Sequence, residues 1–114
     1  MSAQGTTTVN FGAFPGEADT SVAVTGQGSI LSGSLVEVWI YPSATSDHSA
    51  DEHVIDPPYV VAGNISAGVG FTIYAFAPNL LAHTDYFRWM ANQGGYALPA
   101  PLPYGQWTVA WCWN

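Results

Sequence analysis

The chain has very little charge, and almost none of it is positive. Only nine of its 114 residues are charged, Arg88 is the single basic one, and lysine is absent. Soluble domains usually carry about 25% charged residues, whereas this chain carries 8%. A free monomer normally keeps apart from its neighbours with a surface of mixed charge. The shortage therefore favours a component of an assembly, with part of its surface covered by other protein.

The missing positive charge also argues against whole classes of partner. Nucleic-acid binding needs clustered Lys and Arg, and a chain with a net charge of −7 has no such cluster. Anionic membrane surfaces are disfavoured for the same reason, and no apolar run approaches the roughly 20 residues of a membrane span. The first residues lack the basic and apolar regions of a signal peptide, so we expect synthesis in a cytoplasm.

Cysteine is nearly absent as well. Cys112 has no second cysteine to pair with, so the chain is not a disulfide scaffold. A chain of this length is typical of one domain and buries roughly two-thirds of its unfolded surface, which is enough for a hydrophobic core. The glycines lie in turn-like contexts with no helical pattern after them, so no nucleotide fingerprint is present and we expect no cofactor.

The residues that are present follow the sequence pattern of a β protein. The 12 glycines and 8 prolines are spread along the chain, and the short runs between them are rich in Val, Ile, Thr and aromatic residues. The clearest strands are expected at residues 35–41, 70–76 and 106–114, with a shorter one at 59–62 that ends in a turn at Gly63-Asn64. The pattern predicts an all-β, antiparallel sandwich or jelly-roll-like domain of about seven strands over residues 9–114. Residues 1–8 are expected to form a flexible arm or an edge segment.

Aromatic residues gather on two strands and in one long connection. Residues 78–104 are too long for an ordinary connection, and we interpret them as a functional aromatic loop. In the strand at 106–114 three tryptophans share one face, for which core packing is the first interpretation. Four strand tryptophans are many for a small core, so some are also candidates for an intersubunit contact. The interface candidates are Trp39, Trp89, Tyr96, Tyr104, Trp107, Trp111 and Trp113.

The polar chemistry is concentrated in residues 47–53. This segment holds three carboxylates and two imidazoles, which are Asp47, His48, Asp51, Glu52 and His53. One helical turn would bring Asp47 beside Asp51 and His48 beside Glu52, and such pairs can hold a divalent cation. The spacing matches neither the HExxH motif nor an EF-hand loop. We therefore favour a solvated loop whose Asp and Ser residues cap a turn; a structural metal site or an interface hydrogen-bond network is the alternative.

Several stretches of the chain carry a resemblance to a known group of sequences. They are Val9-Asn10-Phe11-Gly12, Pro15-Gly16, Ser21-Val22-Ala23-Val24-Thr25-Gly26-Gln27, Val36-Glu37-Val38-Trp39, Ala44-Thr45-Ser46-Asp47-His48-Ser49-Ala50-Asp51-Glu52-His53, Ala62-Gly63-Asn64-Ile65, Gly70-Phe71-Thr72-Ile73-Tyr74 and Gly105-Gln106-Trp107-Thr108-Val109-Ala110-Trp111-Cys112-Trp113-Asn114. Over most of its length, residues 78–104 excepted, the chain resembles small uncharacterised proteins of tailed bacteriophages. The resemblance implies a structural role in the virion and brings no active site with it.

Charge and resemblance together lead to one expectation about function. Because neither a GxSxG elbow nor a P-loop occurs, we expect no enzymatic activity and no catalytic residues. The chain is expected to be a virion structural protein, most simply a capsid decoration (cement) protein that binds the major capsid protein or other virion proteins. We expect a homo-oligomer, with a trimer favoured. The alternatives are a tail or fibre component with a carbohydrate- or receptor-binding β-sandwich, and a metal-assisted hydrolase built on residues 47–53.

Overall fold

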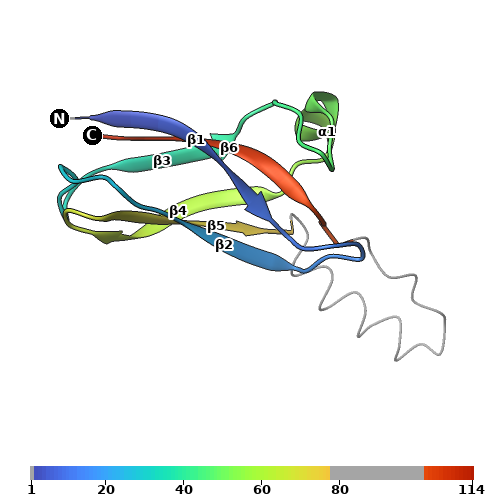
Figure 1. The fold of residues 1–114 in the computed structure, drawn as a ribbon, viewed down its shortest axis with the longest axis horizontal. Helices are drawn as coiled ribbons and strands as arrows, with labels where there is room; N and C mark the ends of the chain where they lie inside the picture. The colour runs from blue at the N-terminus through green and yellow to red at the C-terminus, as the bar shows by residue number, and fades with distance from the viewer. Residues whose placement is uncertain (1, 78–101) are drawn as a thin grey trace, which may run out of the picture.

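The computed structural model describes residues 2–77 and 102–114, which form an antiparallel β-sandwich with one short helix (Figure 1). The elements in chain order are β1 (Ala3–Asn10), β2 (Asp19–Val24), β3 (Val36–Ile40), α1 (Ala50–Ile55), β4 (Tyr59–Ser66), β5 (Gly70–Phe76) and β6 (Gln106–Trp113). The predicted all-β sandwich is confirmed, with six strands in the described residues where about seven were expected. Of the aromatic loop expected at 78–104, only residues 102–104 belong to the described part of the chain.

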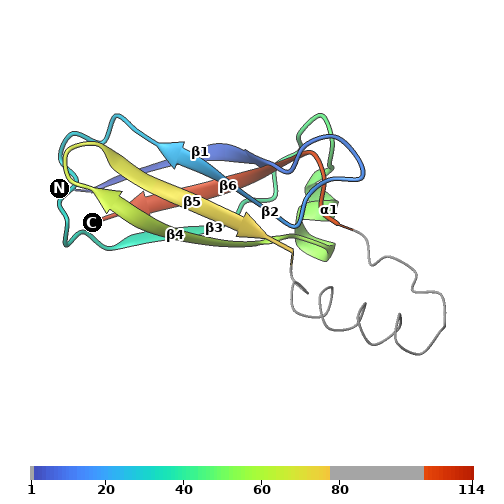
Figure 2. The same ribbon diagram turned by 90° about the horizontal axis from the view of Figure 1, so that it is seen from below.

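The strands form two layers. One sheet has the order β1-β6-β3 and the other β2-β5-β4, and all pairs are antiparallel (Figures 1 and 2). Only β4 and β5 follow one another within a sheet; every other consecutive pair of strands lies in opposite sheets. The two chain ends meet at one end of the sandwich, where Ala3 pairs with Trp113, and α1 lies at the other end.

The space between the sheets is filled mainly from β6. Its alternation turns Trp107, Val109, Trp111 and Trp113 toward the opposite sheet, where all four are buried. The Phe71 ring meets Trp111 edge to face, with centroids 5.5 Å apart. The indole N–H of Trp113 donates to the side-chain oxygen of Gln27 at 2.9 Å. The remaining members of this core cluster are Val9, Phe11, Val24, Ile30, Ile73 and Ala75.

This burial corrects three of the interface candidates. Trp107, Trp111 and Trp113 are each 7% exposed or less, so their rings mainly pack the core. Two of the buried indole N–H groups have acceptors within the chain, since Trp107 donates to the Tyr104 carbonyl at 3.2 Å and Trp113 donates to Gln27. No buried side-chain nitrogen or oxygen of the described residues lacks a hydrogen-bond partner.

The N-terminal segment is a strand and not a flexible arm. β1 pairs with β6 along its whole length, from Ala3 opposite Trp113 to Asn10 opposite Gln106. Gly5 permits the close approach, because a Cβ there would lie 2.6 Å from the Trp111 ring. The expectation of a flexible arm is therefore wrong for residues 3–8, and its alternative, an edge segment, is right.

The turn predicted at Gly63-Asn64 is also wrong. β4 runs through these residues to Ser66, and the hairpin turns at residues 67–69 instead. Asn64 adopts a left-handed conformation with φ 52°, and the pairing register with β5 shifts between Gly63 and Ser66. Asn tolerates this conformation in a bulge as readily as in a turn, so the residue type alone could not separate the two.

Candidate functional site

The segment between β3 and β4 closes one end of the sandwich and carries α1. Ser49 caps this helix: its hydroxyl accepts from the Glu52 N–H at 3.2 Å, and the Glu52 carboxylate accepts from the Ser49 N–H at 3.1 Å. This reciprocal capping box, with Asp51 and Glu52 in the first turn, suits the positive end of the helix dipole. The expected capping by Ser is confirmed at Ser49, but its reciprocal partner is Glu52 and not an Asp. The segment is also not a solvated loop, since it forms a short helix and buries His48 and His53.

The start of the segment is tied to the start of β6. The Thr45 hydroxyl donates to the Gln106 carbonyl at 2.8 Å and accepts from the N–H groups of Asp47 and His48 at 3.2 and 3.1 Å. The Asp47 carboxylate accepts from the Gln106 N–H at 2.8 Å. Thr45 and Asp47 together therefore bind both backbone groups of Gln106.

His53 joins α1 to the same strand from inside. Its ring is 2% exposed. Nδ1 donates to the Ser49 carbonyl at 2.7 Å, and Nε2 accepts from the Thr108 N–H at 2.9 Å. These two contacts require a neutral ring with its proton on Nδ1.

The His48 ring lies between the Glu52 side chain and the Tyr104 backbone. Nδ1 donates to the Glu52 carboxylate at 2.7 Å, Nε2 donates to the Tyr104 carbonyl, and the ring stacks on Trp107 at a centroid distance of 3.9 Å. Both ring nitrogens of His48 therefore face oxygen acceptors. The hydrogen bond from His48, aided by the Ser49 N–H, holds the pKa of the Glu52 carboxyl below its ordinary value of 4.5.

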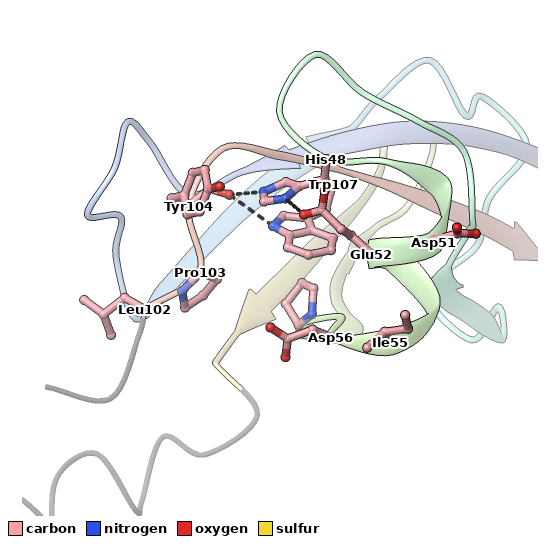
Figure 3. Close-up of a pocket in the computed structure, with 10 residues that line it drawn as sticks. His48, Asp51, Glu52, Ile55, Asp56, Leu102, Pro103, Tyr104 and Trp107 are labelled. Atoms are coloured by element: carbon pink, nitrogen blue, oxygen red, sulfur yellow. Dashed lines mark hydrogen bonds and ion pairs between the residues drawn. The ribbon is translucent and has the colours of Figure 1, made fainter. Parts of the chain in front are cut away.

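Beside this network lies an open cleft of about 370 Å³ between α1 and residues 102–104 (Figure 3). Its lining residues are His48, Asp51, Glu52, Ile55, Asp56, Pro58, Leu102, Pro103, Tyr104 and Trp107. Three of them are carboxylates, and none is Lys or Arg. Apolar walls with an acidic rim suit an aliphatic side chain that ends in a positive group, or a sugar ring laid against the aromatic residues.

The far wall of the cleft is fixed by the loop that joins β1 and β2. Glu17 donates its N–H to the Pro103 carbonyl at 3.2 Å, and the Phe14 ring meets Tyr104 edge to face at 5.4 Å. Gly16, with φ 86°, is needed here, because a Cβ would lie 1.9 Å from the Pro103 oxygen. The loop between β1 and β2 therefore holds Pro103 and Tyr104 in place.

Four of the five candidate metal ligands form hydrogen bonds within the chain. Asp47 binds Gln106, His48 pairs with Glu52, and His53 bridges α1 and β6. Within residues 2–77 and 102–114, no group of three His, Cys, Asp or Glu side chains could hold a metal ion. The hydrogen-bond network considered for this segment exists, but it lies within the chain.

The remaining interface candidates separate by position. Trp39 is 44% exposed on the outer face of its sheet, and Tyr104 lines the cleft. Trp89 and Tyr96 lie outside the described residues. The sequence did not indicate Ile55, Pro58 or Leu102 as site residues, because only the tertiary structure brings them together.

Other large apolar side chains are exposed on the outer faces of both sheets. On the first sheet they are Leu35, Trp39 and Tyr41, and on the second Tyr59, Val61 and Tyr74.

In the part of the chain that the structure describes, no helix is both long and apolar enough to cross a membrane. Comparison with family models, with curated proteins and with solved structures found no match to this chain.

Proposed function

We propose that this protein is a non-enzymatic structural protein of a bacteriophage virion, most simply a capsid decoration protein that binds the outer shell through protein–protein contacts. The observation that carries the proposal is the pairing of scarce charge with exposed apolar side chains. Nine charged residues are left to cover the surface, while Trp39, Tyr41, Tyr59, Val61 and Tyr74 are at least 40% exposed. Contiguous exposed apolar surface usually marks a contact with another protein.

The mechanism is burial of these faces against the major capsid protein or another virion protein. Each Å² of apolar surface removed from water contributes about 25 cal/mol before the cost of association. Many copies on one shell add multivalency, so modest individual contacts are sufficient. The polar side chains fit the same role, because His48, His53 and Asp47 are occupied in holding the fold.

The charge of the protein predicts the chemistry of its partner. With a net charge of −7 and an acidic rim at the cleft formed by Asp51, Glu52 and Asp56, a contacting surface that presents Lys or Arg is favoured. Such complementarity raises the association rate and weakens as salt is added.

The experiment uses particles that lack this protein. Purified protein is mixed with them and the bound fraction is measured by co-sedimentation. We expect wild-type protein to bind and the Trp39→Glu/Tyr41→Glu variant to bind less, with Leu31→Glu, at an exposed position in the loop before β3, as the control. Failure of the folded wild-type protein to bind such particles would overturn the proposal.

A second candidate is favoured by the cleft itself. In this reading the protein is a tail or fibre component, and the cleft holds a host carbohydrate or receptor group against Tyr104 and the carboxylates. Glycan-array binding that is lost in Asp51→Asn/Asp56→Asn would support this function over decoration. Particle binding without any glycan signal would exclude it.

A further inference from the structure

The outer edge of β1 is the least protected strand edge in the described residues. β1 is eight residues long, Ala3 to Asn10, and contains no charge and no proline. Its pairing with β6 runs without a register shift. Natural edge strands usually carry charges, prolines or bulges that prevent pairing with another chain.

The hydrogen bonds of β6 show which N–H and C=O groups of β1 point away from the sheet. Leu35 and Asn114 exchange both of their N–H···O=C bonds, at 3.1 and 2.9 Å. In an antiparallel ladder such pairs alternate, so even-numbered residues of β6 bond β3 and odd-numbered ones bond β1. The β1 residues opposite the odd-numbered set are Ala3, Gly5, Thr7 and Val9. The N–H and C=O groups of Gln4, Thr6, Thr8 and Asn10 therefore point away from the sheet.

The other three edges are protected. β2 begins at Asp19 and β3 has Glu37 near its centre. β4 contains the register shift between Gly63 and Ser66. The chain as a whole carries −7, so two copies repel one another in general, but two β1 edges can meet without bringing like charges together.

We propose that β1 pairs antiparallel with β1 of a second copy around a two-fold axis, so that the two three-stranded sheets become one sheet of six. The register that uses every free group places Thr7 opposite Thr7 of the second copy, Thr6 opposite Thr8, and Gln4 opposite Asn10. All four outward-directed residues of each copy are then bonded. In this register, paired residues of the two β1 strands have their side chains on the same face of the six-stranded sheet, as sheet geometry requires.

This pairing goes beyond the proposed virion role and does not depend on it. A two-fold contact is self-complementary and closes at two copies. It therefore predicts a dimer in place of the trimer that the sequence favoured, and sedimentation equilibrium on the full chain distinguishes the two.

The first test removes one outward N–H. Thr6→Pro deletes a donor that β6 does not use, and proline is tolerated on strand edges where the N–H faces outward. We expect the wild type and Thr6→Val, which keeps the donor, to form dimers, and Thr6→Pro to be a folded monomer by sedimentation and circular dichroism. A wild type that is monomeric up to millimolar concentration, or trimeric, overturns the proposal, as does a dimeric folded Thr6→Pro.

A second test covers the case in which Thr6→Pro does not fold, and it also fixes the register. Thr7 would face its own copy at a non-hydrogen-bonded position, where Cα atoms lie about 4.5 Å apart, which is within disulfide range. In a Cys112→Ser background, Thr7→Cys should form an intermolecular disulfide under mild oxidation, and Thr8→Cys should not. Equal crosslinking of the two variants, or none at Thr7→Cys, contradicts this pairing.

Discussion

At the scale of single residues, the two histidines of the 47–53 segment hold the same helix through different hydrogen-bond patterns. His53 donates from one nitrogen and accepts at the other, whereas His48 donates from both. Each connects α1 to the β6 end of the sandwich, one through Thr108 and the other through Tyr104. Imidazoles that looked like candidate metal ligands are thus part of the hydrogen bonding that closes the domain.

We expect His53→Ala to lower the free energy of unfolding by about 2–4 kcal/mol, because it removes a buried side chain, leaves a cavity and takes away the acceptor of the Thr108 N–H. Urea denaturation measures the change. Asp51→Ala, on the exposed side of the same helix, is the matched control and should shift stability by no more than about 0.5 kcal/mol. Equal effects of the two substitutions would contradict the bridging role.

Glu52 gives the fold a pH dependence of known sign. Its pKa is lowered from 4.5 in the folded state, so as the pH falls the unfolded chain takes up the proton first. The stabilisation is complete above pH 4.5 and is lost as the pH falls through the lower folded value. We expect Glu52→Gln to have a flatter stability–pH curve in this acidic range, measured by thermal unfolding at a series of pH values; identical curves would show that the pair with His48 is energetically silent.

At the scale of elements, β6 is the strand on which the rest of the molecule depends. It lies between β1 and β3 and turns three tryptophans into the core. At its start it accepts a hydrogen bond from Thr45 and donates to Asp47 and His53. β1 covers one side of it closely because Gly5 leaves room for Trp111. Side-chain size on β1 therefore controls how well the central strand is covered.

We predict that Gly5→Ala destabilises the protein by about 1–3 kcal/mol, because its Cβ would lie 2.6 Å from a ring atom of the buried Trp111. Gly33→Ala is the control, since nothing lies within 4 Å of a Cβ at that position. Chemical denaturation of both variants provides the comparison. A neutral Gly5→Ala would mean that β1 is held less tightly than the structure describes.

At the scale of the whole molecule, the core is assembled from strands far apart in the sequence. Val9 and Val24, near the start of the chain, share one cluster with Phe71 and Trp111. Without the other sheet, the apolar inner face of either sheet would be exposed to water. The two layers are therefore expected to unfold together.

Urea unfolding followed by tryptophan fluorescence and by circular dichroism should give coincident transitions, because the tryptophans of one sheet pack against the other sheet. A Trp89→Phe background restricts the fluorescence signal to the tryptophans of β3 and β6. Two separated transitions would indicate that the sheets are independent units.

The sequence by itself determined the fold class and the local devices. Strict alternation in residues 106–114 predicted the tryptophan face of β6, and the Asp and Ser residues around positions 47–53 predicted a capped turn. Scarce charge led to the expectation of a contact-rich surface, which stays a prediction. These features depend on neighbouring residues along the chain, which is why a pattern could reveal them.

Only the tertiary structure decided which of these residues are buried and which remain open. β1 is polar and rich in threonine, so no local pattern distinguished an arm from a strand, and its order comes from β6, roughly a hundred residues away along the chain. The cleft joins α1 to residues 102–104, and Gly63-Asn64 became a bulge through pairing with β5. Long-range pairing settles such features, because free energy is gained only when distant segments meet.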